Sequence, residues 1–504
     1  MRTVVQSFLA ALSVVLLIST TGAPRLEAAT RSSFKETVNI SELRAAYAEA
    51  AAGGEKVRIL IMPGHEPQYG GAEFMGYYER EFAVTIANLL EKELGADANF
   101  EVLVARGNQG WNDDFSRYFD RQERKIKRFV ESHKEAYEKL LERGRVKELK
   151  EQAAHNAAPG DVALRLYGVT KWANENDVDL MVHIHLNDET SHAPNERGVY
   201  SGASLYIPDR IYGNANASKE VAESVLKRLT TTSPVSNFGY ETKGVVEDRE
   251  LIAIGAFNTS EVPSILIEYG YIYEPRITGD GARDAVFADY AYQTALGIKE
   301  FFGAPVSARY DTTALPHMFT GDILATSTAS ARDIYALQAL LRTLNFYPGS
   351  EASLNTCPVS GSMNECTTNA LKAFQASKGL EQNGSLGPET RALLNAVQGF
   401  ATANVVSVSK VPDTACAAFT STLAIDVTDT DTNGEVSRLQ TILAKDKEIY
   451  PEGLVTGFYG PATDRAVKRF QIANNIVTVS SGTYGVVGPA TKKALVSLCS
   501  TGRS

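Results

Sequence analysis

The stretch "VRILIMPGHEPQYGG", residues 57–71, decides the fold. Its first six residues are apolar except for Arg58, which predicts a strand covered on both faces. The Pro-Gly pair that follows ends the strand and forces a turn. His65 therefore lies just past the carboxyl end of a buried strand, the edge where ligands and catalytic groups gather in open α/β sheets. A turn histidine without a task is the alternative, and partners at the same edge would decide against it.

Length and charge limit the classes of protein that this sequence can encode. With 504 residues, the chain is long enough for about three domains. The hydrophobic fraction of 44% and the charged fraction of 22% are typical of a soluble globular protein. The net charge of −10 argues against a nucleic-acid partner, because phosphate binding needs a basic face. After the N-terminus, no stretch has the length that a stable membrane span requires.

The N-terminal residues have the layout of an export signal. Arg2 precedes an apolar run over 8–18, and small residues follow up to Ala28 and Ala29. We therefore assign residues 1–29 to a signal peptide and expect the protein in the periplasm, the cell wall or the extracellular space. An uncleaved membrane anchor is the alternative.

Residues 57–303 alternate between apolar strands and amphipathic helices. This pattern predicts an α/β domain with a mostly parallel sheet and helices on both faces. The expected strands are 57–62, 100–105, 180–185, 203–207 and 264–268, and the expected helices are 79–94, 168–176, 218–229 and 290–302. A densely charged insertion at about 113–152 interrupts the pattern. We expect it to form a solvated helical hairpin, with a regulatory lid as the alternative.

The C-terminal part contains an internal repeat. Each copy has a Leu-Gln pair, a Phe-Gln pair and a Gly-Pro-x-Thr helix start, in that order, and proline is tolerated in the first turn of a helix. The pattern predicts two small all-α modules of three helices. The expected segments are a linker at 304–330, a first module at 331–398, a second linker at 399–431 and a second module at 432–500.

All four cysteines follow residue 350. In an exported chain, an even number of cysteines indicates disulfides, although four cysteines allow three pairings. Cys357 and Cys366 could close a local loop in the first module. Cys416 and Cys499 bracket the second module and could tie its ends together. We favour these two pairs.

Two imidazoles and two carboxylates come together at the edge that carries His65. Glu79 opens the first predicted helix, while His185 and Glu268 each end a predicted strand. A catalytic zinc takes three ligands from His and Asp or Glu and keeps a fourth position for water, while a further carboxylate moves protons. We therefore expect His65, Glu79 and His185 to bind one catalytic Zn²⁺ and Glu268 to be the general acid/base.

Three nearby polar residues are weaker candidates. His183 lies on the same strand face as His185 but deeper in the sheet, and we expect it to be a hydrogen-bonded structural histidine. His192, on the loop that follows, and Asn187 are candidate substrate contacts.

These residues also carry a family resemblance. The segments "PGHEPQYGG", "YEREFAVTIANLLEKEL", "DLMVHIHLN" and "SEVPSILIEYGYI" resemble the zinc-dependent N-acetylmuramoyl-L-alanine amidases of the type 3 family, over residues 57–302. The C-terminal repeats resemble peptidoglycan-binding modules. The resemblance implies a hydrolase that cleaves the amide between N-acetylmuramic acid and L-alanine of the stem peptide. Met62 and Glu66 depart from the usual pattern, in which Asp and Gly stand at these positions.

Other functions are compatible with the same motifs. One is a catalytically silent wall-binding regulator, and another is a zinc peptidase that acts within the stem peptide. The intact set of four site residues favours the amidase. We expect peptidoglycan as the partner, bound by modules that lie beyond a flexible linker and contribute nothing to the active site. The sequence identifies no protein activator.

Overall fold

A computed structural model gives the structure of most of the chain. It describes residues 34–147, 158–189, 191–279, 281–304, 316–324, 329–350, 352–398, 419–425, 427–446, 448–450, 455, 457, 459, 461–477 and 483–501. The expected signal peptide lies outside these ranges. Within them, no helix has both the length and the apolar character of a membrane span.

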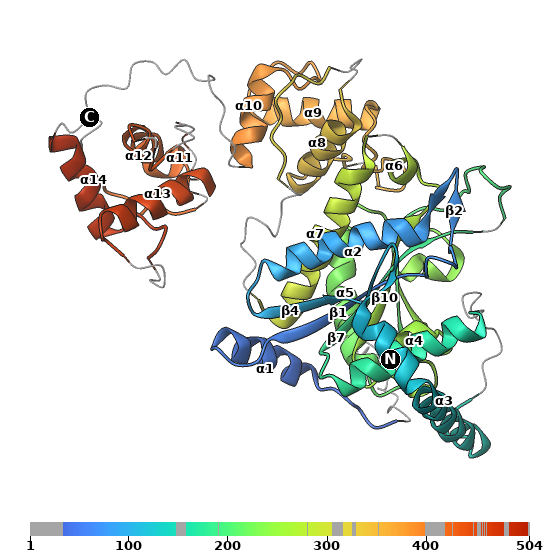
Figure 1. Ribbon diagram of the computed structural model, residues 1–504. Helices are drawn as coiled ribbons and strands as arrows, with labels where there is room; N and C mark the ends of the chain where they lie inside the picture. Colours follow the sequence, from blue (N-terminus) through green and yellow to red (C-terminus); the bar gives the residue numbers. More distant parts are fainter. Residues whose placement is uncertain are drawn as a thin grey trace, which may run out of the picture.

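A six-stranded sheet forms the centre of the N-terminal domain (Figure 1). In spatial order its strands are β4 (Phe100–Val104), β1 (Val57–Pro63), β7 (Leu180–Asn187), β10 (Ser264–Tyr271), β8 (Ser204–Pro208) and β9 (Val245–Asp248). Neighbouring strands run parallel, except that β8 is antiparallel to β10. The mostly parallel sheet is therefore confirmed. Because Glu268 pairs in register with His185, the strands that carry them end at the same edge.

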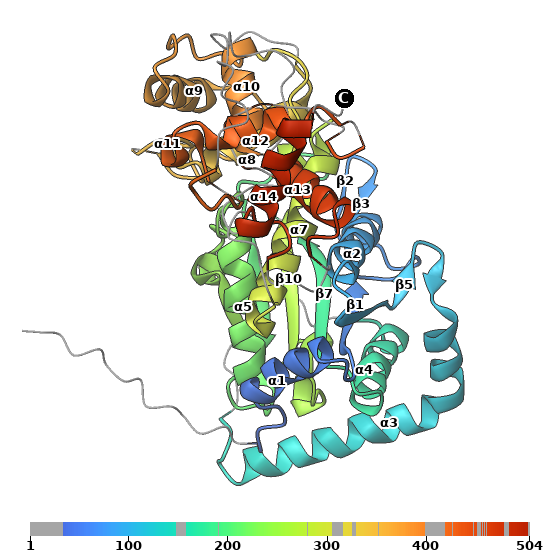
Figure 2. The same cartoon turned by 90° about the vertical axis from the view of Figure 1, so that its left-hand side faces the viewer.

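Helices cover both faces of the sheet, as expected (Figure 2). They are α1 (Ile40–Ala51), α2 (Glu79–Gly95), α3 (Asp113–Glu142), α4 (Gly160–Glu175), α5 (Ala215–Leu229), α6 (Pro275–Thr278) and α7 (Arg283–Phe302). Short elements complete the domain: β2 (Glu73–Phe74), β3 (Tyr77–Tyr78), β5 (Arg106–Gly107), β6 (Gly110–Trp111), η2 (Gly239–Lys243), η3 (Ile252–Ile254) and η4 (Ala256–Asn258).

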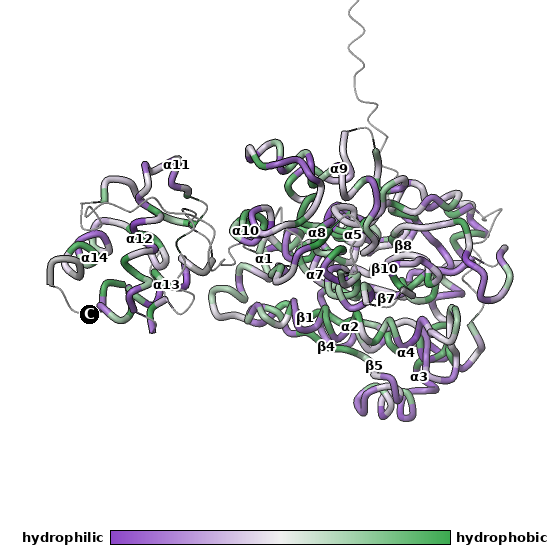
Figure 3. The backbone as a smooth tube through the Cα atoms, turned by 90° about the horizontal axis from the view of Figure 1, so that it is seen from above, coloured by the Kyte–Doolittle hydropathy of each residue, from purple (hydrophilic) through white to green (hydrophobic). Residues whose placement is uncertain are grey.

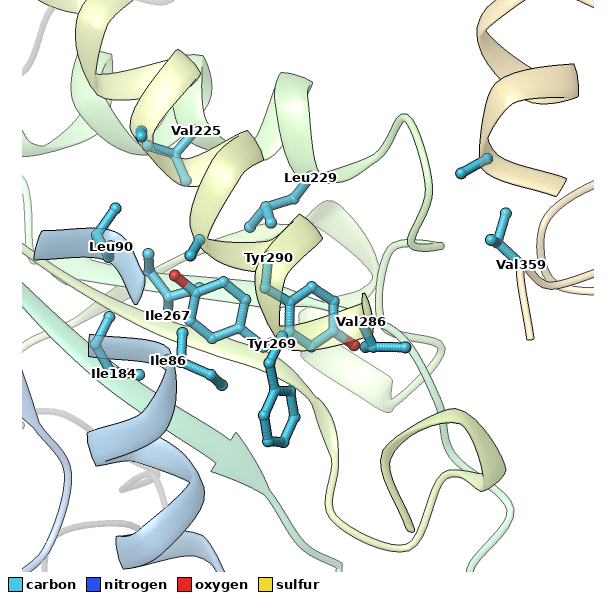
Figure 4. Close-up of a cluster of buried hydrophobic side chains, with 14 of the residues drawn as sticks. Ile86, Leu90, Ile184, Val225, Leu229, Ile267, Tyr269, Val286, Tyr290 and Val359 are labelled. Atoms are coloured by element: carbon cyan, nitrogen blue, oxygen red, sulfur yellow. The ribbon is translucent and has the colours of Figure 1, made fainter. Parts of the chain in front are cut away.

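Successive side chains of β1 point to opposite faces of the sheet. Because helices cover both faces, the strand is apolar on both sides. Ile59 and Ile61 join the cluster that contains residues of α2, α5 and α7, whereas Leu60 and Met62 join the cluster of α3 and α4. Figure 4 shows the first cluster, in which the rings of Tyr269 on β10 and Tyr290 on α7 stack with centroids 4.9 Å apart. Burial of a large apolar side chain contributes about 1.5–3 kcal/mol, so both layers stabilise the strand that leads to His65.

The described part of the charged insertion, up to residue 147, differs from the expected hairpin, and residues 148–152 lie outside the described structure. Its main element is one 30-residue helix, α3, which is capped by the side chain of Asn112 and is largely hydrophilic in Figure 3. Its apolar side packs on α4, where the ring of Phe115 lies 4.7 Å from that of Trp172. Gly168 permits this approach, since a Cβ atom there would lie 2.9 Å from Phe119. α4 itself begins at Gly160, earlier than the sequence pattern predicts.

The C-terminal repeats form small helical modules. The first contains α8 (Ala331–Thr343), α9 (Glu365–Ser377) and α10 (Pro388–Val397), and the second contains α11 (Asp429–Thr432), α12 (Glu435–Leu443), α13 (Pro461–Ala473) and α14 (Pro489–Thr501). Cys357 and Cys366 form a disulfide, as expected. Cys416 lies outside the described residues, as does the side chain of Cys499, so the second pairing stays a prediction.

The repeated glutamines explain the sequence pattern of the modules. In the Phe-Gln pairs, Gln375 donates to Thr390 and Gln471 donates to Thr491, and each threonine belongs to a Gly-Pro-x-Thr start. These glutamines are buried, so each needs such partners to avoid an unpaired amide. The motif thus fastens the helix with the Phe-Gln pair to the helix with the Gly-Pro-x-Thr start, α9 to α10 in the first module and α13 to α14 in the second.

Parts of the expected linkers belong to the modules. In the first expected linker, Ile323 is buried and pairs with Leu386, and in the second, Leu423 is buried and pairs with Val487. Each module therefore includes a short segment that precedes its first helix. The reason is that the module needs an additional apolar side chain to close its small core.

The first module does not stand apart from the N-terminal domain. Its residues share one hydrophobic cluster with α7, and Tyr335 on α8 donates a 2.9 Å hydrogen bond to the buried Asp289 on α7. Asp289 also accepts from Thr232 at 2.6 Å, and burial raises its pKa. Arg342 of the module donates to the carbonyl of Thr231. The expectation that a flexible linker separates this module from the N-terminal domain is therefore wrong.

We predict that removal of the first module destabilises the N-terminal domain. A chain that ends at Ala304 loses the Tyr335 donor to Asp289, which keeps Thr232 and Gln293, and the loss of one such hydrogen bond costs about 0.5–1.5 kcal/mol. The shorter chain also exposes the apolar side of α7 that shares a core with the module. The expected fall in Tm is roughly 2–10 °C, whereas a chain that ends at Gln398 should keep the Tm of the domain. Thermal unfolding of both chains checks this. Equal Tm values would contradict the shared core.

Candidate metal centre and active site

The turn after β1 holds His65 in a narrow space. Gly64 donates its N–H to Ile184 at 2.8 Å, which pins the turn to β7. A Cβ atom on Gly64 would lie 2.4 Å from the ring of His185, so only glycine fits at this position. His65 has a φ of 63°, which is uncommon for a residue with a side chain. The two imidazole rings are 5.0 Å apart at 72°.

Glu79, at the start of α2, contacts both histidines. Its Oε2 lies 2.8 Å from His65 Nε2, and its Oε1 lies 2.9 Å from His185 Nδ1. The N–H groups of Ala72 and Leu186 donate to the same carboxylate at 2.8 and 3.1 Å. The fold therefore brings His65 and His185 together around the carboxylate of Glu79, as the sequence predicts.

Electrostatics favours an ionised Glu79. Burial alone would raise its pKa, but the charge of His65 and hydrogen bonds from both histidines hold the pKa well below its usual range. Burial would also lower the pKa of His65, and the charge of Glu79 reverses that effect and raises it. The result is a buried anion that faces two imidazole nitrogens, an arrangement that stabilises positive charge between them.

The three side chains fit a metal ion. His65, Glu79 and His185 each offer one ligand atom, and these atoms all lie within 4.8 Å of one another. Two imidazole nitrogens and a carboxylate oxygen form a donor set typical of catalytic zinc. Gly71 keeps the space open, because a Cβ atom there would lie 2.4 Å from both Glu79 and His65. The site therefore has the donors and the room that one small cation requires.

Glu268 lies in the same pocket as the three ligand candidates. The pocket has a volume of about 340 Å³, within the range of small-molecule sites. The Glu268 side chain is 5% exposed, and its Oε2 has no hydrogen-bond partner in the described structure. Burial, together with the charges of Glu79 and Glu241, raises its pKa well above the ordinary value. Such a carboxyl group can hold a proton that an ordinary glutamate would release.

His183 differs from the hydrogen-bonded structural histidine that we expect. It lines the pocket, is 2% exposed, and its Nε2 has no hydrogen-bond partner among the described residues. Burial and the charge of His185 lower its pKa to about 3, so it is neutral. It does not belong to the three-residue ligand group.

The two candidate substrate contacts lie in different places. Asn187 lines the pocket and is buried, with its Nδ2 2.8 Å from Glu241. Within the described structure, His192 does not line the pocket. Its ring nitrogens contact Asp188 at 2.9 Å and the carbonyl of Ala193 at 3.0 Å, and only Asp188 is a pocket residue.

Arg106 is a site residue that sequence reasoning misses. It is 2% exposed and donates to the carbonyls of Pro63, Gly64 and Arg80. Burial lowers its pKa to about 10. These bonds tie the turn that carries His65 to the first turn of α2. The sequence gives no local signal for this role, because Arg106 simply follows an apolar strand.

Glu66, which stands where the resembled family often has Gly, forms an ion pair with Arg165 of α4. Arg165 contacts both carboxylate oxygens of the buried Glu66, at 2.6 and 2.7 Å. It also contacts Asp161, which accepts from Tyr69 at 3.2 Å. A bidentate pair of this kind is geometrically specific. It fixes the start of α4, which lines the pocket together with Tyr69.

Glu241 on η2 is a second buried carboxylate that the sequence pattern does not reveal. It is fully buried and lies close enough to accept hydrogen bonds from Asn187, Tyr206, Ser236 and Tyr271. These donors come from β7, β8, β10 and a loop. The single carboxylate therefore joins η2 to three strands beside the pocket.

Comparisons with known proteins give two family matches. Residues 59–300 match the model of the family N-acetylmuramoyl-L-alanine amidase, and residues 330–394 and 432–495 match the model of a peptidoglycan binding domain. A search of curated proteins found no significant relative.

A comparison with solved structures matches this chain to three amidases, among others. An N-acetylmuramoyl-L-alanine amidase from Clostridium difficile 630 is 19% identical with a TM-score of 0.31, over 49% of this chain and 95% of that chain. Ami1 from Mycobacterium smegmatis is 15% identical with a TM-score of 0.34, over 49% and 98%. The catalytic domain of CwlV from Bacillus (Paenibacillus) polymyxa is 16% identical with a TM-score of 0.30, over 49% and 99%.

We predict that Arg106→Met lowers the affinity for added Zn²⁺ about 10–100-fold, as expected for loss of a group that orients metal ligands. The reason is that the His65 turn loses its bonds to Arg106, and with them its fixed position beside Glu79. Titration against a chromophoric chelator measures the affinity. Arg58→Met, at the far end of β1, is the matched control and should leave it unchanged. An unchanged affinity in the Arg106 variant would refute this role.

Proposed function

We propose that this protein works by a zinc-dependent mechanism. Its residues 59–300 form a domain of the N-acetylmuramoyl-L-alanine amidase family. The protein is a peptidoglycan amidase with C-terminal peptidoglycan-binding domains. Its proposed reaction is hydrolysis of the amide that joins N-acetylmuramic acid to L-alanine of the stem peptide. The observation that carries the mechanism is the contact of one buried carboxylate, Glu79, with two histidines in a pocket that also holds Glu268.

In the proposed site, His65, Glu79 and His185 hold the zinc ion. When bound, zinc lowers the pKa of a water molecule and polarises the carbonyl group that the water attacks. The protein keeps the three ligands ready for the ion. The backbone N–H groups of Ala72 and Leu186 orient the Glu79 carboxylate, and Arg106 holds the turn of His65.

Glu268 is the proposed general acid/base. As base it takes a proton from the attacking water, and as acid it gives that proton to the amine nitrogen of L-alanine, which leaves. The raised pKa of Glu268 supports this role, because the carboxyl group must hold a proton until the amine departs. Its Oε2 is buried and has no hydrogen-bond partner in the described structure, so this oxygen is available to the reacting groups.

Asn187 is the proposed substrate contact on the pocket wall. The NH₂ group of Asn187 donates to Glu241, which leaves the amide oxygen to accept from the substrate. His192 acts through Asp188 in this proposal, since its ring contacts that residue rather than the pocket.

The proposed cellular site follows from the substrate. A peptidoglycan amidase acts outside the cytoplasm, and we propose that residues 1–29 direct its export. Mass spectrometry of the N-terminus of the exported protein tests this, with a mature chain expected to begin near Thr30. A mature protein that retains residues 1–29 would contradict cleavage and indicate an anchor.

Mutagenesis should distinguish the metal-binding role of Glu79 from the proton-transfer role of Glu268. Glu79→Ala is expected to lose metal and activity together, because it removes a ligand. Glu268→Gln is expected to stay folded and zinc-loaded while turnover falls about 10²–10⁴-fold, the usual contribution of a general acid/base. Metal analysis and turnover on a soluble muramoyl peptide are the two measurements.

Glu261→Gln is the matched control, because this exposed glutamate lies shortly before β10. It should retain both metal and turnover. A Glu268→Gln protein that keeps full turnover, or that purifies without zinc, would exclude the proposed role. Release of an amine only from within the stem peptide would instead indicate a peptidase.

A further inference from the structure

The pocket continues beyond the metal ligands toward the starts of the parallel strands. There, one row of side chains crosses four neighbouring strands. His183 pairs with Met62 on one side and with Leu266 on the other, and all three line the pocket. Leu266 pairs in turn with Tyr206, which also lines it. Because His183 precedes His185 by two residues on β7, the row lies about 6.6 Å from that ligand along the strand. We call this part of the pocket the lower chamber.

The walls of the lower chamber come from the β5–β6 hairpin, α4 and the segment of η3. They carry four pocket-lining residues that pack in the same clusters as residues of the floor: Trp111, Leu166, Leu251 and Ala253. All four side chains are apolar or aromatic. An ion that leaves water for such surroundings without a partner loses much free energy, so the chamber suits an uncharged group.

Two ring nitrogens of the lower chamber are buried without a partner. His183 is 2% exposed, and its Nε2 makes no hydrogen bond to any of the described residues. Within the same part of the chain, Nε1 of Trp111 is likewise unpaired. The hydroxyl of Tyr206, by contrast, donates to Glu241 at 2.6 Å. An unpaired buried polar group costs about 1–3 kcal/mol, so a ligand that pairs with these nitrogens gains affinity.

The two nitrogens indicate which chemical group the chamber can bind. An indole N–H only donates, so the ligand must offer an acceptor to Trp111. A neutral imidazole has one donor and one acceptor nitrogen, so His183 can pair with either kind of group, depending on its tautomer. Together with the apolar walls, these nitrogens suit a small neutral amide that has an apolar end. An acetamido group has a carbonyl, an N–H and a methyl, and so meets each requirement.

The substrate of the proposed reaction carries an acetamido group near the scissile amide. It is attached to the sugar that bears the lactoyl group, several bonds away from the scissile carbonyl carbon. The methyl of L-alanine is much closer to that carbon, so it does not extend over the step of about 6.6 Å from His185 to His183. That methyl also has nothing to offer an unpaired nitrogen. The acetamido group is therefore the part of the substrate that fits.

We propose that the lower chamber binds the acetamido group of N-acetylmuramic acid, with Trp111 donating to its carbonyl oxygen and His183 forming a second hydrogen bond to the group. This inference rests on the proposed function and adds a specificity site for the sugar. Trp111 pairs with Arg106 across the β5–β6 hairpin. The arginine that holds the His65 turn therefore also fixes this wall of the chamber.

The test uses the zinc-loaded full chain and two substrates with the same scissile amide. One is N-acetylmuramoyl-L-alanyl-D-isoglutamine, and the other has a hydroxyl group in place of the acetamido group. The wild-type chain should cleave the first with a kcat/KM about 10–100-fold higher. Trp111→Phe and His183→Phe keep an aromatic ring but remove its nitrogen, and each should lower this ratio about tenfold, because a site that binds a polar group rejects an analogue that lacks it.

The ratio of two kcat/KM values in one protein does not depend on the fraction of chains that is folded or zinc-loaded. Trp172→Phe is the matched control, since in the described structure this tryptophan does not line the pocket, and it should keep the wild-type ratio. Equal kcat/KM values in the wild-type chain would overturn the inference while the proposed reaction stands. An unchanged ratio in Trp111→Phe or His183→Phe would overturn the role of that residue. If the wild-type chain cleaves neither substrate, the proposed function itself fails.

A second measurement does not depend on turnover. The chain has two tryptophans, so Trp172→Phe leaves Trp111 as the single one. Its fluorescence should change when N-acetylmuramic acid is added, because the acetamido group would contact the indole ring. The analogue with a hydroxyl group in place of the acetamido group should have no effect at the same concentration. No change with N-acetylmuramic acid, or an equal change with both sugars, would overturn the assignment.

Discussion

The contact of the Glu79 carboxylate with His65 and His185 is the interaction on which the rest of the site depends. His65 lies on the turn after β1, His185 lies on β7, and Glu79 opens α2, which lies between them in sequence. A buried anion is unfavourable unless it is paired, so the fold must deliver both imidazoles to it. Gly64 and Gly71 serve that requirement, because a larger residue at either position would collide with the group.

Hydrogen bonds from neighbouring residues fix the positions of the segments that carry this contact. Arg106 joins the His65 turn to α2, and Glu66 with Arg165 joins the following loop to α4. On the other side, Glu241 ties η2 to the central strands. Arg106, Glu66 and Glu241 are buried, and their hydrogen bonds reach several segments around the pocket, which fixes its geometry more than any single bond would.

The parts of this structure that sequence reasoning predicts are those with a local signal. The period of apolar residues identifies the strand of residues 57–62, and the ends of strands place His65, His185 and Glu268 at one edge. Arg106 and Glu241 carry no such signal, since their roles arise from contacts between segments that are distant in sequence. Likewise, hydrophobic periodicity cannot distinguish an exposed module face from one that packs on α7.

The first module illustrates that limit further. A segment rich in Thr, Ala and Ser predicts a flexible connection, and composition alone supports this interpretation. The buried bond between Tyr335 and Asp289 contradicts it, because a hydrogen bond in a shared core requires a fixed relative position. The hairpin expected from the charged insertion fails for a related reason. Its apolar stripe packs on α4, and within the described residues the chain stays helical from Asp113 to Glu142.

The central claim is that Glu79 and the two histidines hold the catalytic metal. X-ray absorption spectroscopy at the zinc edge of the purified full chain tests it most directly. The account predicts two imidazole nitrogens at about 2.0–2.1 Å and further oxygen ligands at about 2.0–2.2 Å. A spectrum with sulfur scatterers at about 2.3 Å, or with no imidazole contribution, would contradict it.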